Sequence, residues 1–186
     1  MIRKLWIVVA AVVAVAAGAA YAELPTTLEE FQARVTDQAS DPQKAVKLFF
    51  DGIFIFLSGE EQLGKDCIME MSRYKEWSES QHRMLLERMK SQPWIYRSYA
   101  KGATPQNKYD MNPQEYELVF HGEPNMKPYA DKEAGAFCKL FVISGGADNP
   151  RSLTLQKNNA GLYKVYEFSS INLGVRPPAN ANDGNF

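Results

Sequence analysis

The chain has 186 residues, which is enough for one domain with a substantial core and short for two. Apolar residues make up 45% of it and the formal net charge is -1, so the composition excludes a disordered or strongly basic protein. The basic residues are scattered without a Lys/Arg run, and we therefore expect no nucleic-acid partner.

The N-terminal residues have the three parts of a secretory signal peptide. Arg3 and Lys4 form a positive start, residues 5–20 are an uncharged apolar run, and Ala-Tyr-Ala precedes the expected cleavage before Glu23. The alternative is an uncleaved anchor, but the run is short for a bilayer span of about 20 residues. With the signal at residues 1–22 removed, we predict an exported protein, periplasmic or extracellular, without a stable membrane span.

Four helices are predicted in the first half of the remaining chain. Hydroxyl residues three positions before Glu or Gln indicate helix starts near Thr27, Ser58 and Ser78, and Ser40-Asp41-Pro42 indicates another. The helix that begins at Pro42 has a wide apolar face and is expected to be the centre of the core. That face consists of Val46, Phe49, Phe50, Ile53, Phe54 and Leu57.

After Pro113 the hydrophobic pattern becomes alternating, which is typical of strands. Strands are predicted over residues 115–120, 136–143 and 152–156. Asn158-Asn159-Ala160-Gly161 then predicts a hairpin turn into a last strand over residues 162–168.

Helices followed by strands predict an α+β fold, in which N-terminal helices pack on a curved antiparallel sheet. We expect a single domain over residues 23–176, cone-like and hollow at its wide end. Residues 177–186 have little apolar material and are predicted to be a flexible C-terminal tail.

Several segments resemble known protein families. "DPQKAVKLFFDGIF" is similar to the first long helix, and "SLTLQKNNAGLYKVYEF" to the closing hairpin, of the cone-shaped α+β proteins named after nuclear transport factor two. "RSYAKGATPQNKY", "LFVISGGADNPRSLTLQK" and "GVRPP" resemble an exported bacterial family known only as a domain of unknown function, over most of residues 42–178. The resemblance implies the fold but no catalytic residues, because the superfamily contains both enzymes and binding domains.

The stretch from Arg97 to Tyr109 is the predicted crossover from the helices to the sheet. It has no hydrophobic period, and Gly102, Pro105 and Asn107 suit the sharp bend that such a crossover requires. Polar and aromatic residues in this loop and in the Ser144–Arg151 turn are candidates for binding a small anion or a partner's carboxylate. The candidates are Arg97, Tyr99, Tyr109, Asp110, Asp148 and Arg151.

Each of these loops also has a purely structural interpretation. Arg97 and Arg151 could pair with Asp110 or Asp148 and pin two loops together. The Ser144–Arg151 turn lacks the Gly-Lys-Ser/Thr ending and the following helix of a phosphate-binding loop. We therefore expect an ordinary turn there, with its two glycines at positive φ.

The cysteines and histidines indicate neither a metal site nor a cofactor site, and they leave one possible disulfide. A disulfide between Cys67 and Cys138 would join a helix to a strand, and the alternative is two buried free thiols. His82 and His121 are the only histidines, they lie in different elements, and no metal-ligand spacing is present. No metal or cofactor is expected.

Three functions remain open from the sequence. The first is an exported, non-enzymatic domain that binds a small ligand or an envelope protein. The second is a hydrolase or isomerase of the cone-shaped fold that uses a buried acid. The third is a neutralising or accessory protein in the periplasm, which no particular residue specifies.

Overall fold

The computed structural model describes residues 23–126 and 136–180, which form an α+β fold as the sequence predicts. The predicted signal peptide lies outside the described residues. In chain order the elements are α1 (Leu28–Gln38), α2 (Pro42–Leu57), α3 (Glu61–Met71), α4 (Ser80–Ser91), α5 (Trp94–Arg97), β1 (Phe137–Val142), β2 (Arg151–Lys157), β3 (Tyr163–Glu167) and the 3-10 helix η1 (Ser169–Asn172).

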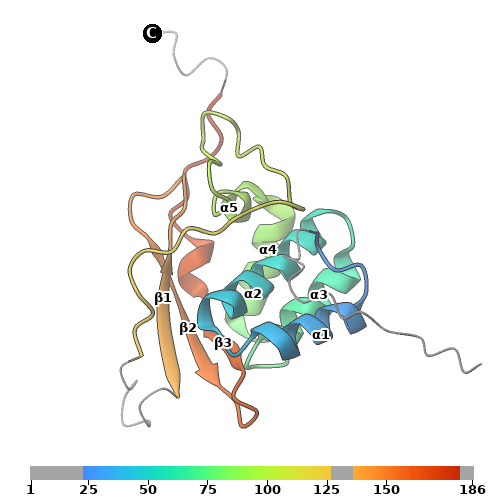
Figure 1. Cartoon of the computed structure of the whole chain (residues 1–186). Coiled ribbons are helices and arrows are strands. Elements are labelled where there is room, and N and C mark those ends of the chain that lie inside the picture. The colour runs from blue at the N-terminus through green and yellow to red at the C-terminus, as the bar shows by residue number, and fades with distance from the viewer. Residues whose placement is uncertain (1–22, 127–135, 181–186) are drawn as a thin grey trace, which may run out of the picture.

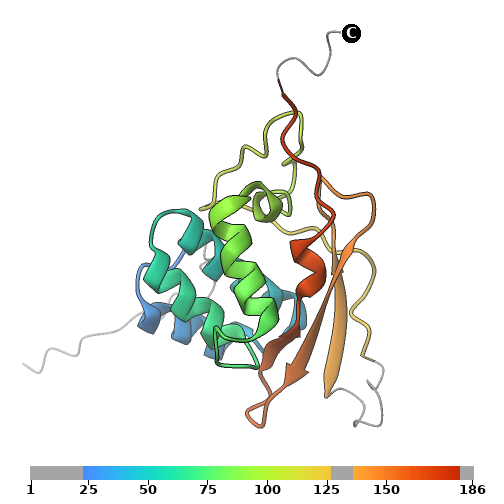
Figure 2. The same cartoon turned by 180° about the vertical axis from the view of Figure 1, so that it is seen from behind.

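The helices gather on one side of the sheet, as Figure 1 shows, and Figure 2 presents the same two layers from behind. α2 lies between the layers, because it contacts α3 on one side and β1 and β3 on the other. Within residues 23–126 and 136–180, no helix is both long and apolar enough to span a bilayer.

The predicted start signals are correct for α1 and α2. The Thr27 hydroxyl accepts a hydrogen bond from the Glu30 amide at 3.1 Å, which satisfies a free N–H group at the start of α1. The Asp41 carboxylate caps α2 in the same way, accepting from the amides of Gln43 and Lys44. Pro42 follows directly, in the first turn, where its missing N–H costs nothing.

The predicted caps at Ser58 and Ser78 are wrong. Ser58 has helical backbone angles, and its hydroxyl donates to the Phe54 carbonyl at 2.8 Å, so it ends α2 instead of starting α3. Ser78 hydrogen bonds to the Glu76 side chain, and α4 begins two residues later. The spacing matched a capping box at both places, but that motif also requires an extended backbone at the cap, which Ser58 does not have.

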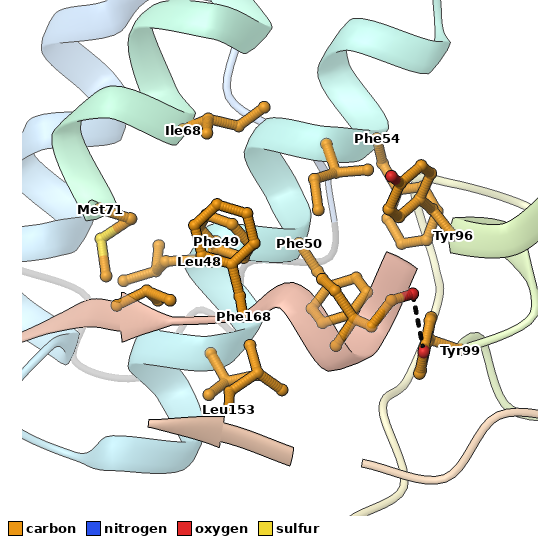
Figure 3. Close-up of a cluster of buried hydrophobic side chains, with 14 of the residues drawn as sticks. Leu48, Phe49, Phe50, Phe54, Ile68, Met71, Tyr96, Tyr99, Leu153 and Phe168 are labelled. Atoms are coloured by element: carbon orange, nitrogen blue, oxygen red, sulfur yellow. Dashed lines mark hydrogen bonds between the residues drawn. The ribbon is translucent and has the colours of Figure 1, made fainter. Parts of the chain in front are cut away.

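α2 is the centre of the core, as predicted. It is covered on all sides, and almost every residue from Ala45 to Phe56 is buried. Figure 3 shows its aromatic rings pointing in several directions from one helix. Phe49 meets Phe168 with ring centroids 4.9 Å apart, and Phe50 meets Tyr99 at 5.2 Å. Such contacts join the helix to the residue that precedes η1 and to the loop after α5, in addition to its contacts with β1 and β3.

The sheet has the order β1-β2-β3 and is antiparallel throughout. Leu140 of β1 stands opposite Leu153 of β2. The predicted hairpin between β2 and β3 is confirmed: the Asn158 side chain accepts from the amides of Ala160 and Leu162, and Gly161 has φ +80°. Only glycine adopts that left-handed conformation without steric cost.

The predicted strand over residues 115–120 is not a regular strand. Its chain lies beside β1 and forms isolated bridges, with Phe120 opposite Val142 and Asn125 opposite Lys139. The ladder is interrupted at Gly122, which has φ +71°, and at Pro124, which has no N–H to donate. The segment therefore covers the edge of β1 without extending the sheet as a regular strand.

Candidate functional site

Three segments that are distant in sequence meet at one end of the domain. They are the crossover loop (residues 98–113), the Ser144–Arg151 turn and the C-terminal segment (residues 173–180), and Figure 1 shows them together beyond α5. The hydroxyls of Ser98 and Ser144 lie 2.7 Å apart, and the Gly145 amide donates to the Ser98 carbonyl at 2.8 Å. The two predicted site loops are therefore held against each other.

The crossover loop closes on itself through Asn107. The Asn107 carboxamide oxygen accepts from the amides of Thr104 and Tyr109, and its nitrogen donates to the Gly102 carbonyl at 3.0 Å. Gly102 has φ +83°. The interpretation of Gly102 and Asn107 as bend-forming residues is thus confirmed, and the loop satisfies much of its own backbone.

Tyr109 is held in a costly backbone conformation. Both Lys108 and Tyr109 have φ near +58°, in the left-handed region that costs L-residues about 1–2 kcal/mol each. The Tyr109 side chain is fully buried, and its hydroxyl donates to the Arg176 carbonyl at 2.7 Å. This burial and hydrogen bond offset the backbone cost, so Tyr109 serves to anchor the loop.

The two glycines of the Ser144–Arg151 turn are not at positive φ, contrary to the prediction. They are required for space instead. A Cβ atom on Gly145 would collide with the Ala103 carbonyl, and one on Gly146 would collide with the Tyr109 hydroxyl. Close approach between segments, which depends on tertiary structure, explains these glycines.

Arg176, the last residue of the predicted domain, and Ala179, within the predicted tail, are both bound to this cluster. The Arg176 amide donates to the Gly146 carbonyl at 2.9 Å, and the Ala179 amide donates to the Pro105 carbonyl at 2.9 Å. Backbone hydrogen bonds therefore extend the ordered domain past residue 176. Residues 181–186 lie outside the described part of the chain.

Two predicted site residues have structural roles. Tyr99 is 1% exposed, it packs on Phe50, and its hydroxyl donates to the Ile171 carbonyl at 3.0 Å (Figure 3). Arg151 donates to the carbonyls of Leu173 and Gly174 at 3.1 and 2.9 Å. Tyr99 is part of the core, and Arg151 fastens the C-terminal segment to β2.

Asp148 also lies outside any common site with the other candidates. It is exposed and pairs with Arg176 at 3.7 Å, a weak surface contact. The alternative interpretation, in which Arg97 or Arg151 pairs with Asp110 or Asp148, therefore names the wrong partners. The loops are pinned, but mainly by backbone groups.

The structure brings Arg97, Tyr109 and Asp110 together around one pocket of about 240 Å³. This Arg97 pocket lies between the C-terminal end of α2, α5 and the crossover loop. Its other lining residues are Phe54, Leu57, Ser58, Met111 and Pro113. Asp110 and Met111 also border a neighbouring groove of about 400 Å³.

The charges at this pocket have no partner within the described residues. Arg97 and Asp110 are both exposed, and neither side chain forms a hydrogen bond or an ion pair with another residue of the described ranges. The Asp110 amide is bound to the Asn107 carbonyl, which holds the residue in place. The pocket thus presents one positive and one negative side chain that no residue of the described ranges neutralises.

The cysteines are free and buried, so the structure contains no disulfide between them. The pKa of the Cys67 thiol is raised to about 12 and that of Cys138 to about 11. Burial is the main cause, and nearby carboxylates contribute, among them Asp66 for Cys67 and Asp41 for Cys138. Both thiols therefore stay protonated and unreactive near neutral pH.

Two other groups capable of chemistry are occupied inside the core. His82 is buried, with Nδ1 3.0 Å from the Glu76 carbonyl oxygen and Nε2 3.0 Å from the Ser72 hydroxyl, and burial lowers its pKa. Asp51 is the buried acid. It accepts from the Lys47 ammonium at 2.6 Å and from the Tyr116 hydroxyl at 2.7 Å. Across the described ranges, no group of three His, Cys, Asp or Glu side chains could hold a metal ion.

A second pocket was missed by the sequence analysis, which treated the basic residues as scattered. The segment after α3 and the β2–β3 hairpin enclose about 520 Å³, and four cations from these two segments line it. They are Arg73, Lys75, Lys157 and Lys164. No local pattern marks this cluster, because its members come from two segments more than 80 residues apart.

Comparison with known proteins gives the family but no activity. Neither the curated proteins nor the solved structures include a match to this chain. A family profile described as "Domain of unknown function (DUF6935)" matches residues 23–179, which is most of the chain and ends within the bound C-terminal segment. The chain therefore belongs to this domain-of-unknown-function family.

Proposed function

We propose that the protein is an exported, non-enzymatic binding domain that holds a small ligand in the Arg97 pocket. The observation that carries this proposal is the pair of charges, Arg97 and Asp110, which line one pocket and have no side-chain partner among the described residues. A guanidinium and a carboxylate that line one pocket suit a ligand that bears both an anionic and a cationic group. The volume of about 240 Å³ suits a small ligand, and Leu57, Met111 and Pro113 offer apolar contacts beside the two charges.

Binding is favoured over catalysis by the groups that are missing from this pocket. Asp110 is its only acid, it is exposed, and no histidine or cysteine is among the lining residues. The Ser58 hydroxyl is engaged with the Phe54 carbonyl. The alternative enzyme hypothesis requires a buried acid, and Asp51, which is buried away from this pocket, is held by Lys47 and Tyr116. A general acid or base commonly works beside a hydrogen-bonded partner, and no side chain of the described residues pairs with Asp110.

Export and origin are parts of the same proposal. The signal-peptide pattern before Glu23 supports an exported, periplasmic or extracellular location. The family profile begins at residue 23, which agrees with a domain that starts at the proposed cleavage site. The proposed bacterial origin and the cone-like fold of nuclear transport factor two rest on the resemblance described above, and the packing of helices on an antiparallel sheet supports the latter.

The ligand proposal is tested with zwitterions, using free amino acids and dipeptides as probes and isothermal titration calorimetry as the measurement. We expect a subset with apolar side chains to bind. Arg97→Gln and Asp110→Asn should each weaken that binding by about tenfold, because each removes one charge-assisted hydrogen bond. Both side chains are exposed, so the thermal midpoint should stay within about 2 °C.

Asp148→Asn is the matched control. It neutralises a carboxylate in the same loop cluster but outside the pocket, and should leave the affinity unchanged. An equal loss of affinity in all three variants, or the absence of binding by every probe, would contradict the proposal. Turnover of a substrate that disappears in Asp110→Asn would show that the protein is an enzyme.

Export is tested by the intact mass of the protein recovered from the cell envelope of a bacterial host. We expect a species that begins at Glu23 or within a residue or two of it, because the small residues before Glu23 fit signal peptidase. A full-length species extracted only with detergent would instead identify the N-terminal run as a retained anchor.

A further inference from the structure

The second pocket, here called the basic pocket, lies between two segments that backbone contacts hold together. On one side lie residues 72–75, directly after α3, and on the other lies the β2–β3 hairpin. The Arg73 amide donates to the Val165 carbonyl at 2.7 Å, and Ser72 forms a bridge with Val165. These backbone contacts hold the segment after α3 against β3, so the pocket does not depend on a mobile loop.

The charge of the basic pocket is strongly unbalanced. Its nine lining residues include four cations and no acid. Within the described part of the chain, Glu70 is the one carboxylate that pairs with them, through Lys164 at 2.7 Å. The last carbonyls of α3 offset some of the remaining charge, because Lys75 donates to the carbonyl oxygens of Met69 and Glu70.

The other two cations have neutral partners. Arg73 uses its Nε to donate to the Gln156 side chain at 2.9 Å, and the ammonium of Lys157 lies 4.8 Å from the centre of the Tyr163 ring. The positive groups also act on one another. Burial lowers the pKa of Lys75, and the charges of Lys164 and Arg73 lower it further, although Glu70 acts in the opposite direction.

We infer that the basic pocket binds a phosphate group, at a site separate from the Arg97 pocket. Like charges that line one pocket repel one another, and an anion of two negative charges relieves that repulsion. Three of the four cations are lysines, whose ammonium groups act as point charges and suit the many oxygens of a phosphate. The side chains of Asn158 and Asn159 at the hairpin add polar groups to the same rim.

The experiment uses pyrophosphate as the soluble probe, titrated calorimetrically into the purified protein at low and at raised salt. We expect binding that weakens with salt, as charge-dominated binding does. Lys157→Gln and Arg73→Gln should each reduce the affinity by about tenfold, the loss of one charge-assisted contact. Lys157 is exposed and has no carboxylate partner in the described chain, so its substitution should keep the fold. If Arg73→Gln lowers the thermal midpoint markedly, its loss of affinity could come from a damaged fold, and the affinity of Lys157→Gln for pyrophosphate is then the test.

Lys90→Gln is the matched control. It removes one positive charge, as Lys157→Gln does, but near the C-terminal end of α4. Lys90 pairs there with Glu61, at the start of α3, whereas the basic pocket lies after the end of α3. Its affinity for pyrophosphate should stay within about twofold of the parent, because the charge removed is remote and exposed. A loss equal to that of Lys157→Gln would overturn the assignment, since it would show an effect of net charge only.

Two further measurements, with lipid vesicles and with citrate, distinguish a lipid phosphate from a soluble phosphate and from other anions. Binding to phosphatidylglycerol vesicles but not to phosphatidylcholine vesicles, abolished by Lys157→Gln and without binding of pyrophosphate, would place the phosphate on a lipid headgroup. Citrate tests whether the site prefers phosphate to other anions, because its negative charge is similar to that of pyrophosphate but is carried by carboxylates. Citrate binding as tight as that of pyrophosphate, or no binding of pyrophosphate and vesicles alike, would overturn the proposal.

Discussion

Phe50→Ala should lower the free energy of unfolding by about 3–5 kcal/mol, enough to unfold a domain of ordinary stability. Phe50 is fully buried at the centre of α2, and its ring contacts those of Phe49, Phe54 and Tyr99. Truncation removes apolar surface from the core and leaves a cavity among rigid aromatic neighbours, which cannot all move to fill it. Urea unfolding followed by circular dichroism measures the change.

Two further variants make this test specific. Phe50→Leu retains most of the buried volume and should cost clearly less than the alanine variant. Tyr74→Ala removes an aromatic ring that is 38% exposed, and we expect a cost below about 1 kcal/mol. A near-neutral result for Phe50→Ala would show that this face of α2 is not the packed core.

Gly64→Ala should also destabilise the protein strongly, by about 1–3 kcal/mol or more. In an exposed helix the same change would stabilise by about 1 kcal/mol, because alanine has the higher helix propensity. At Gly64, however, a Cβ atom would lie 2.5 Å from the backbone nitrogen of Phe56, within the crossing of α2 and α3. The two helices would have to separate, and the loss of their packing outweighs the gain in propensity.

The control for Gly64→Ala is Gln62→Ala in the same helix. Gln62 is exposed and hydrogen bonds only to the Asp66 side chain among the described residues, so we expect a change within about 0.5 kcal/mol. The comparison is made by chemical unfolding of both variants. Stabilisation by Gly64→Ala would mean that α2 and α3 are not in close backbone contact.

The candidate site was predicted only in part, and the reason is visible in particular residues. Arg97, Tyr109 and Asp110 do meet at one pocket, because Arg97 ends the short helix α5 and the other two lie in the loop that follows it. Tyr99 lies two residues from Arg97, yet it points into the core and packs on Phe50. A tyrosine in an aperiodic stretch suits a binding site and an aromatic core equally, so its direction depends on what packs above it.

The sequence by itself determined the α+β class, the position of α2, its cap at Asp41 and the hairpin at Asn158–Gly161. These features depend on residues within a few positions of one another, through helical periodicity, capping and turn conformations. Only the tertiary structure decided why Gly145 and Gly146 are needed, and how Arg73 comes to lie beside the β2–β3 hairpin. Both arise where the helical layer and its loops dock on the sheet, and contacts between segments so far apart in the chain leave no local pattern to read.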